Sequence, residues 1–280
     1  MSGVAGGSLP GVPVRLGGFY AMMRPFRRYD GSPVKELAPY QDDVWNDRFR
    51  DQRSRYYIKG PGVGISKLLL METLNVILAN ERRIDALVLV ASRREAHRRR
   101  DGVLDMIEGS KYSGCLVRRH EYTNRMGTHA AHEGTGIVLR PPGDALGEQA
   151  SGITFRSAVG FVSSSINMHH VLVLDAMESG FPTEAISMGM AHALTSTMLT
   201  GGKMVVAMTP RAPFYRLGER MPGINDTEPG EALQAGEELA RRIPMSIAAD
   251  AGIIERSAES RAEMRLLDKD IRDAKYPMPR

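Results

Sequence analysis

The sequence has few features that would cross-link the chain or anchor it in a membrane. Its one cysteine, Cys115, cannot form an internal disulfide, and without a second thiol it cannot build a cysteine-based zinc site. No apolar run approaches the roughly 20 residues that cross a bilayer. The glycine-rich start also lacks the charged-then-apolar order of a signal peptide. We therefore expect a cytoplasmic protein with no membrane partner.

Aromatic residues make up only 6% of the chain, whereas hydrophobic residues reach 42% and charged residues 25%. A chain of 280 residues with this composition can bury a sizeable core, which excludes a collagen-like or wholly disordered protein. The net charge of +4 is unevenly distributed, because residues 1–215 carry 26 Lys and Arg against 20 Asp and Glu. This basic excess is compatible with a polyanionic partner such as nucleic acid.

Strand-like and helix-like periodicities alternate from about residue 40. They predict strands at 56–59, 85–91, 136–140, 152–156, 171–175 and 203–208, and helices at 66–79, 93–108 and 183–199. Such alternation is typical of an α/β protein with a mostly parallel sheet and helices on both faces. The runs at 87–90, 171–174 and 204–207 are continuously apolar, as in central strands buried on both sides.

A glycine-rich stretch, Gly60 to Ser66, follows the first predicted strand and opens the first predicted helix. Glycines let backbone N–H groups approach phosphate oxygens, and a helix N-terminus favours negative charge. The loop is one residue shorter than the pattern G-x-x-x-x-G-K-[ST], with Ile65 in the lysine position and Ser66 in the Mg²⁺-binding hydroxyl position. Lys59 and Lys67 flank the loop and are candidates for the missing cation. The alternative is a turn that serves ordinary strand-to-helix packing.

A second candidate element is the apolar run 171–174, which is followed directly by Asp175. A strand of this form can end in an aspartate that holds Mg²⁺ beside bound phosphates. The alternative is a buried strand capped by a polar residue. A third apolar strand leads into Thr209 and Pro210, and the three elements together form a less common combination.

Together these stretches resemble the ATPase domain of the phage terminase large subunit, the motor that packages viral DNA. The resemblance spans roughly residues 36–215 and keeps the family's order of motifs. It rests on Pro39-Tyr40-Gln41, the loop segment 57–67, residues 87–96, the strand 171–175 and the segment 202–210.

The resemblance implies a P-loop fold that uses ATP and Mg²⁺. It assigns Mg²⁺ to Ser66 and Asp175, the adenine side to Gln41, and coupling to the γ-phosphate to Thr209. Together with the loop glycines and the two flanking lysines, the candidate nucleotide-contacting residues are Gln41, Lys59, Gly60, Gly62, Gly64, Ser66, Lys67 and Thr209.

Three departures from the family pattern matter. Pro61-Gly62 stands where many relatives carry Arg-Gln, so a cis arginine is missing. Ala176 occupies the position that usually holds the catalytic glutamate, and Glu178 is the nearest replacement, so we expect impaired hydrolysis. The roughly 60 residues after the predicted linker are too few for the family's nuclease domain, and DNA cleavage by this chain is not expected.

Several arginines are candidates for contacts outside the loop. Arg140 and Arg156 end predicted strands and are candidate trans-acting fingers for a neighbouring subunit's nucleotide, or ordinary strand-end arginines. A further cluster on the predicted helix 93–108 suits phosphate contacts or a subunit interface, with a solvated helix face as the ordinary alternative. Its members are Arg93, Arg94, Arg98, Arg99 and Arg100.

The predicted organisation is a flexible glycine-rich arm at 1–30, a P-loop ATPase-like domain at 31–215, and a linker with a helical C-terminal subdomain at 216–280. In the last part we expect helices at 231–242 and 257–274.

The leading functional hypothesis is an ATP-driven motor that translocates double-stranded DNA in the host cell cytoplasm. The resemblance implies a portal and a small terminase subunit as partners, and a homo-oligomer as the active form. The alternative is a non-catalytic P-loop-fold protein that serves viral assembly or binds nucleic acid. A nucleotide-dependent metabolic transferase would require an acceptor pocket that the sequence does not reveal.

Overall fold

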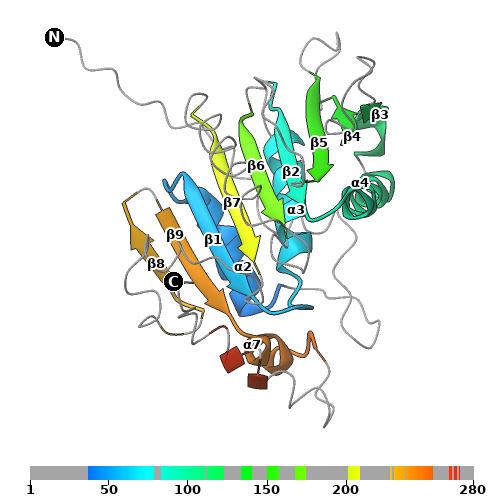
Figure 1. Ribbon diagram of the computed structural model, residues 1–280. Helices are drawn as coiled ribbons and strands as arrows, with labels where there is room; N and C mark the ends of the chain where they lie inside the picture. Colours follow the sequence, from blue (N-terminus) through cyan, green and yellow to red (C-terminus); the bar gives the residue numbers. More distant parts are fainter. Residues whose placement is uncertain are drawn as a thin grey trace, which may run out of the picture.

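The computed structural model describes residues 37–78, 83–110, 112–122, 134–140, 150–157, 168–174, 201–208, 228, 230–236, 238–254, 265–266, 268–269 and 271. These residues form a nine-stranded sheet with helices packed against it (Figure 1). The strands are β1 (Ser54–Lys59), β2 (Ala86–Val90), β3 (Leu116–Tyr122), β4 (Gly134–Leu139), β5 (Ser151–Ser157), β6 (His170–Leu174), β7 (Lys203–Met208), β8 (Ala232–Ala235) and β9 (Glu238–Ile243). The helices are α2 (Pro39–Asn46), α3 (Ile65–Leu78), α4 (Arg93–Glu108) and α7 (Met245–Asp250), with short 3-10 turns η1 (Asp47–Phe49) and η2 (Ser113–Cys115).

The strand order across the sheet is β3-β4-β5-β2-β6-β7-β1-β9-β8. The six neighbours from β5 to β9 run parallel, whereas β4 is antiparallel to β5, β3 to β4, and β8 to β9. The carboxyl ends of the six parallel strands therefore meet at one edge of the sheet, which we call the carboxyl edge. The predicted α/β class with a mostly parallel sheet is confirmed.

The central strands are buried on both faces, as their continuous apolar runs predict. In β2, Ala86, Val88 and Val90 join one hydrophobic cluster, whereas Leu87 and Leu89 join a second cluster on the other face. The first cluster includes residues of α2, α3, α4 and α7, and Figure 1 shows α2 and α3 behind the same face of the sheet. On the second face the described helical contact is Ile271, and the helix predicted at 183–199 lies outside the described residues.

Several predicted elements are confirmed with close boundaries. The helix predicted at 93–108 is α4, and the strand predicted at 203–208 is β7. α4 begins where expected because Ser92 is its N-cap, with the Ser92 hydroxyl accepting from the backbone N–H of Glu95 at 3.2 Å. α2, β3 and α7 were not predicted from the sequence.

The helix predicted at 231–242 is wrong, because this segment forms the strands β8 and β9. Its alanine, leucine, glutamate and arginine residues favour a helix on intrinsic propensity. Gly236, at φ 57°, instead permits a reversal between the two strands. Pairing with β1 then buries Leu239 and Ala240, and this tertiary burial outweighs the local preference.

The C-terminal part of the described chain is attached to the sheet. β9 pairs in parallel with β1 along its whole length, so residues 238–243 belong to the same sheet as the predicted ATPase-like domain. A small helical segment follows, made of α7 and the helical residues at 265–271 that the structure describes. The predicted arm at 1–30 lies outside the described residues. Within the described part of the chain, no helix has both the length and the apolar character needed to cross a membrane.

Candidate nucleotide-binding site

The glycine-rich loop connects β1 to α3 at the carboxyl edge of the sheet. Gly62 and Gly64 adopt left-handed backbone conformations, with φ 74° and 79°, which glycine tolerates and other residues rarely adopt. The hydrogen bonds of helix α3 begin with the backbone N–H of Leu68, which donates to the carbonyl of Gly64 at 3.1 Å. The N–H groups of the first helical turn are therefore directed towards the loop, as at anion-binding helix N-termini.

Two side chains of α2 form hydrogen bonds with the backbone of the loop. The Tyr40 hydroxyl donates to the carbonyl of Val63 at 2.7 Å, and Gln41 Nε2 donates to the same oxygen at 3.3 Å. Gln41 is fully buried, and its Oε1 accepts from the backbone N–H of Ala38 at 3.2 Å. Burial raises the pKa of Tyr40, so its hydroxyl stays protonated as a donor. The structure thus places Gln41 against the loop backbone, where a Cβ added to Gly64 would lie 2.7 Å from Nε2.

The C-terminal segment holds the other side of the loop. The N–H of Gly60 donates to the carbonyl of Ile243 in β9 at 3.2 Å. A side chain at Gly60 would overlap Met245, the first residue of α7. α7 is fixed in turn by Asp268, whose two carboxylate oxygens accept from the N–H groups of Met245 and Ser246 at 2.6 and 3.0 Å. This support could not be predicted from the sequence, because its contacts join residues far apart in the chain.

The residues of the loop fit a phosphate group. Pro61 and Gly62 are exposed, and Ser66 and Lys67 are half-buried in the first turn of α3. Lys59, the last residue of β1, is buried. The loop therefore combines backbone N–H groups with the Ser66 hydroxyl and the half-buried Lys67, which are donors of the kind that suit a polyphosphate. Within the described residues, no group of three or more His, Cys, Asp or Glu side chains is placed to hold a metal ion.

The other predicted site elements follow strands that end at the same edge. Leu174 of β6 is in register with Ala207 of β7, which is in register with Tyr57 of β1. β7 lies between the other two strands, so β1 and β6 are not neighbours. The predicted residues that follow these strands all lie outside the described residues, namely Asp175, Ala176, Glu178 and Thr209.

The two candidate finger arginines lie at opposite ends of the strands, and only Arg156 lies at the carboxyl edge. β4 runs antiparallel to β5, so Arg140 follows β4 at the edge opposite the glycine-rich loop, where its N–H donates to Cys115 O at 2.8 Å. Arg140 is exposed and is not brought near this chain's own loop. Arg156 is paired with Leu89 near the end of β5, at the carboxyl edge.

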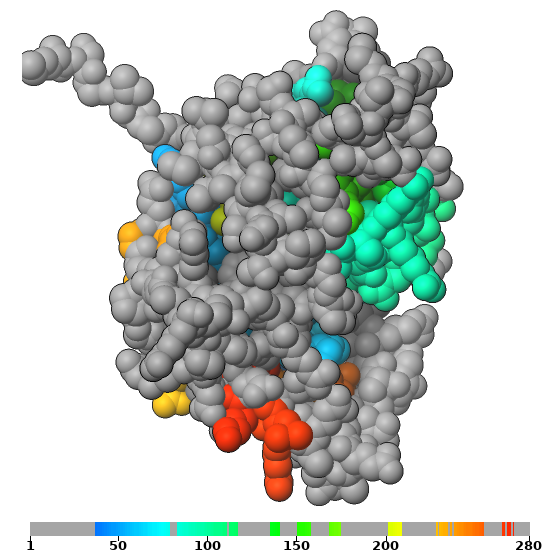
Figure 2. Space-filling view, viewed as in Figure 1, coloured from blue at the N-terminus to red at the C-terminus, as the bar shows by residue number. Residues whose placement is uncertain are grey.

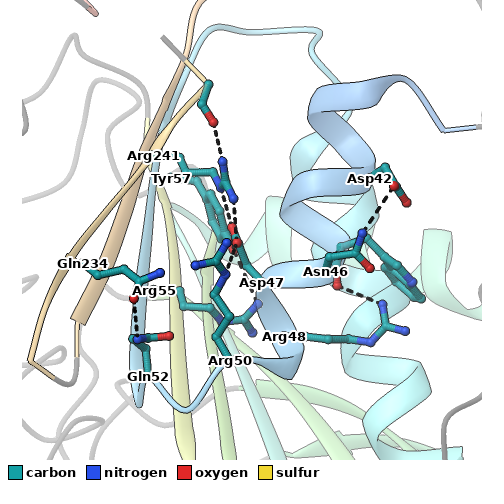
Figure 3. Close-up of polar contacts among 12 residues, drawn as sticks. Asp42, Asn46, Asp47, Arg48, Arg50, Gln52, Arg55, Tyr57, Gln234 and Arg241 are labelled. Atoms are coloured by element: carbon teal, nitrogen blue, oxygen red, sulfur yellow. Dashed lines mark hydrogen bonds and ion pairs between the residues drawn. The ribbon is translucent and has the colours of Figure 1, made fainter. Parts of the chain in front are cut away.

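A buried polar network joins β1 to its neighbours and was not predicted from the sequence; Figure 3 shows its part around Arg55, Tyr57, Asp47 and Arg241. Arg55 donates to both carboxylate oxygens of Glu72 in α3 and to the Tyr57 hydroxyl at 3.4 Å. Tyr57 in turn donates to Asp47 Oδ2 at 3.3 Å, and Arg241 of β9 forms a two-point ion pair with Asp47. The network therefore ties the strand that precedes the loop to α3, η1 and β9.

The charges in this network are fixed by their partners. Burial opposes ionisation of Glu72, but the charge and hydrogen bonds of Arg55 outweigh it and lower the Glu72 pKa. Burial raises the pKa of Tyr57, so its phenol stays neutral. His170, at the start of β6, is also buried, and its loss of solvent lowers its pKa to about 4. A charge within the apolar sequence of α3, as at Glu72, is the signal that could have predicted a buried partner.

Comparisons with solved structures find the same fold. The ATPase domain of the Thermus phage P74-26 large terminase superposes with a TM-score of 0.56 at 12% identity, over 86% of this chain and 94% of that one, and a mutant form of it gives 0.57. The large terminase of a thermophilic bacteriophage in complex with ADP gives 0.50 at 9% identity, over 81% of this chain and 50% of that one. The HK97 bacteriophage large terminase gives 0.50 at 11% identity, over 90% of this chain and 54% of that one.

The chain thus spans nearly all of the isolated ATPase domain and about half of the longer terminases. No protein-family model matches the sequence, and no match is found among curated proteins. The likeness lies in the three-dimensional arrangement, and it agrees with the resemblance seen in the motifs. The chain has the fold of the ATPase domain of phage large terminases.

Proposed function

We propose that this chain is the ATP-binding motor domain of a viral DNA-packaging terminase. The observation that carries the proposal is the glycine-rich loop, held at the carboxyl edge by Gln41, Tyr40 and β9, in a fold shared with terminase ATPase domains. One of the solved large terminases of this fold is a complex with ADP. In parallel sheets, ligands bind beyond the carboxyl ends of the strands, which is where this loop lies.

Each loop residue has a role in the proposal. The backbone N–H groups from Gly60 to Gly64 receive the phosphates, and Lys59 and Lys67 supply positive charge in place of the standard lysine. The Ser66 hydroxyl and Asp175 hold Mg²⁺, which when bound neutralises charge that develops on the phosphates. Gln41 positions the loop through Val63, in addition to the adenine contact that the resemblance implies. Thr209 couples the nucleotide state to the rest of the motor.

The chain lacks a carboxylate at the position that usually supplies the general base for ATP hydrolysis. Alanine at position 176 can neither accept a proton nor orient water, so the residue after Asp175 cannot act as the general base. Glu178 is the candidate replacement, and Arg140 of a neighbouring subunit is a candidate finger. We propose nucleotide binding with slow hydrolysis, in an oligomer that acts on double-stranded DNA together with a portal and a small terminase subunit.

Mg²⁺-ATP binding by the Gly64→Val variant tests the proposed site. Valine at φ 79° is strained and its Cβ would displace Gln41 Nε2, so binding is expected to fall by at least tenfold, or about 1.4 kcal/mol. Gly236→Val is the matched control, because it imposes similar strain at φ 57° in the β8–β9 turn, with open space around it. Both variants are checked for folding by circular dichroism. Equal Mg²⁺-ATP affinity in the wild type and Gly64→Val would show that the nucleotide does not bind at this loop.

A second experiment tests the assignment of the hydrolytic residue. Ala176→Glu is expected to raise the ATPase rate by about 10² or more, the scale of a positioned general base. Brisk hydrolysis by the wild type that is lost in Glu178→Gln would instead assign the role to Glu178. Absence of any binding at millimolar ATP would favour the alternative function, a non-catalytic component of viral assembly.

A further inference from the structure

The charges of α4 are divided sharply between its two halves. Its first two turns, residues 93–100, carry five arginines and one acidic residue, Glu95. Its second half, residues 101–108, carries three acidic residues and no basic one. The first half is therefore strongly positive, although the helix as a whole is nearly neutral.

This arrangement opposes the stability of the helix itself. The N-terminal end of a helix carries partial positive charge and favours acidic side chains, whereas the C-terminal end favours basic ones. α4 has the reverse arrangement at both ends, and Glu95 is its only acidic residue in the first turn. The pairs of Glu95 with Arg98 and Arg99 offset part of this cost, but the exposed Arg93 and Arg94 add positive charge at the N-terminal end, where it is unfavourable. Their presence therefore favours a role other than helix stability.

Three of the five arginines present their positive charge to solvent. α4 packs on the sheet through an apolar face of five buried residues, Ala96, Val103, Leu104, Met106 and Ile107. Arg93 and Arg94 are exposed, and the Arg98 side chain is 68% exposed. Figure 2 shows α4, in green-teal, as a continuous ridge on the molecular surface.

Three of the arginines contact neighbouring side chains. Glu95 forms ion pairs with both Arg98 and Arg99, each at 2.6 Å. Partial burial opposes its ionisation, but the hydrogen bond from Arg98 and the charge of Arg99 outweigh that effect and lower the Glu95 pKa. Arg100 contacts Asp101 at 2.9 Å and the Thr135 hydroxyl of β4 at 2.5 Å. One carboxylate thus orients two guanidinium groups and leaves a large positive excess on the surface.

The chemistry of this surface suits a phosphate backbone better than a protein partner. Protein interfaces are centred on buried apolar or aromatic side chains. Among the described residues, the large exposed hydrophobic side chains are Phe49 and Leu266, and neither belongs to α4. Guanidinium groups, in contrast, are well matched to phosphate oxygens.

We propose that the first two turns of α4 bind the phosphate backbone of double-stranded DNA. This proposal rests on the proposed function, for which it names the surface that contacts the DNA. At about 1.5 Å per residue, Arg93 to Arg100 extends along about 10 Å, or about three base-pair steps of one strand. α4 starts at the carboxyl edge after β2, so the DNA would lie at the same edge as the glycine-rich loop, with β6 and β7 between.

Salt-dependent binding of a fluorescein-labelled DNA duplex of about 30 base pairs tests the proposal. The variant replaces Arg93, Arg94 and Arg98 by glutamine in the full chain. Between about 50 and about 200 mM salt, its slope of log affinity against log salt is expected to be shallower than the wild-type slope by about 2 to 3, with at least tenfold weaker binding at low salt. Replacing the same arginines by lysine keeps the charge and should retain most of the slope.

A matched control removes the same charge elsewhere, in the triple variant Arg83→Gln, Arg265→Gln and Lys269→Gln, whose residues are exposed. The α4 glutamine variant should keep the wild-type Mg²⁺-ATP affinity and a melting temperature equal to or above that of the wild type, because unfavourable helix charges are removed. Equal loss of DNA affinity in the α4 and control variants would overturn the α4 surface and leave the proposed function standing.

Other outcomes also separate the two proposals. A wild type that binds Mg²⁺-ATP but no duplex at low salt would overturn both the α4 surface and the DNA-motor function. Self-association by light scattering that is lost in the α4 glutamine variant, with DNA affinity unchanged, would assign the surface to a second copy of the chain instead.

Discussion

Glu72 of α3 accepts two hydrogen bonds from the guanidinium of Arg55 in β1, with side chains only 3% and 1% exposed. The pair joins the strand before the glycine-rich loop to the helix after it. Removing one partner leaves an uncompensated buried charge, which typically costs about 3 to 5 kcal/mol, whereas replacing both by apolar residues is often neutral.

We therefore expect Glu72→Leu to lower the free energy of unfolding by about 3 to 5 kcal/mol, and the double variant Arg55→Met/Glu72→Leu to recover most of that loss. Urea unfolding measures both changes. A double variant that is as unstable as the sum of the two single variants would show that the residues do not act as a pair.

His170 makes stability depend on pH. Its pKa is lowered to about 4 in the folded protein because burial disfavours the charged imidazolium, against about 6.5 in an unfolded chain. Between these values the unfolded state binds more protons, so this group's contribution is complete above pH 6.5 and is lost as the pH falls towards 4. The shift corresponds to about 3 kcal/mol at most.

His170→Leu should reduce the fall in unfolding free energy between pH 7 and pH 4.5, measured in urea at each pH. Glu72, whose pKa is also lowered, acts in the same direction at lower pH, because its contribution is lost as the pH falls below the ordinary glutamate value. The same pH dependence in wild type and His170→Leu would assign the effect to the carboxylates alone.

Arg241 of β9 contacts both oxygens of Asp47, at 2.6 and 2.8 Å, where the aspartate is fully buried. Lysine cannot reproduce this two-point contact, so Arg241→Lys should lower the free energy of unfolding by about 1 to 3 kcal/mol. Arg50→Lys is the control, since Arg50 contacts the same carboxylate at 3.1 Å from a side chain that is 40% exposed, and it should cost less than about 1 kcal/mol. Equal losses in the two variants would show that the two-point geometry is unimportant.

The close approach of Met245 to Gly60 leads us to expect that a side chain at position 60 would destabilise the loop. A Cβ at position 60 would overlap the Met245 side chain, so Gly60→Ala should lower the free energy of unfolding by about 1 to 3 kcal/mol and weaken Mg²⁺-ATP binding. Shortening the opposing side chain in Gly60→Ala/Met245→Ala should restore nucleotide affinity relative to Gly60→Ala alone. If the double variant binds nucleotide no better than Gly60→Ala, the clash with Met245 is not the cause of the lost affinity.

The sequence predicted the elements whose signals are local. The runs in β2, β6 and β7 are apolar because both faces are buried, and Ser92 marks the start of α4 by its side-chain cap. The glycine-rich loop was also identified from a local signal, its glycines between a strand and a helix, and the structure shows that Gly62 and Gly64 adopt left-handed conformations there.

The supports of the site could not be predicted because they depend on distant pairings. Asp47 and Arg241 are separated by 194 positions, and no local pattern links them. Residues 238–243 favour a helix when considered alone and become a strand only because β1 offers an unpaired edge. The position of Gln41 beneath Val63 likewise follows from the packing of α2 on α3, which the motif alone does not specify.

The place of β1 between β7 and β9 has a consequence for how the protein is made. Ser54 is in register with Met204 on one side and with Glu238 on the other, so both neighbours of β1 are synthesised about 150 or more residues later. Parallel pairings at such long separations form slowly, because chain entropy is lost before contacts are gained. During translation, residues 54–59 therefore remain without either of their neighbouring strands until those segments have been synthesised. The hydrogen bond between Gly60 and Ile243 forms only after Ile243 has left the ribosome.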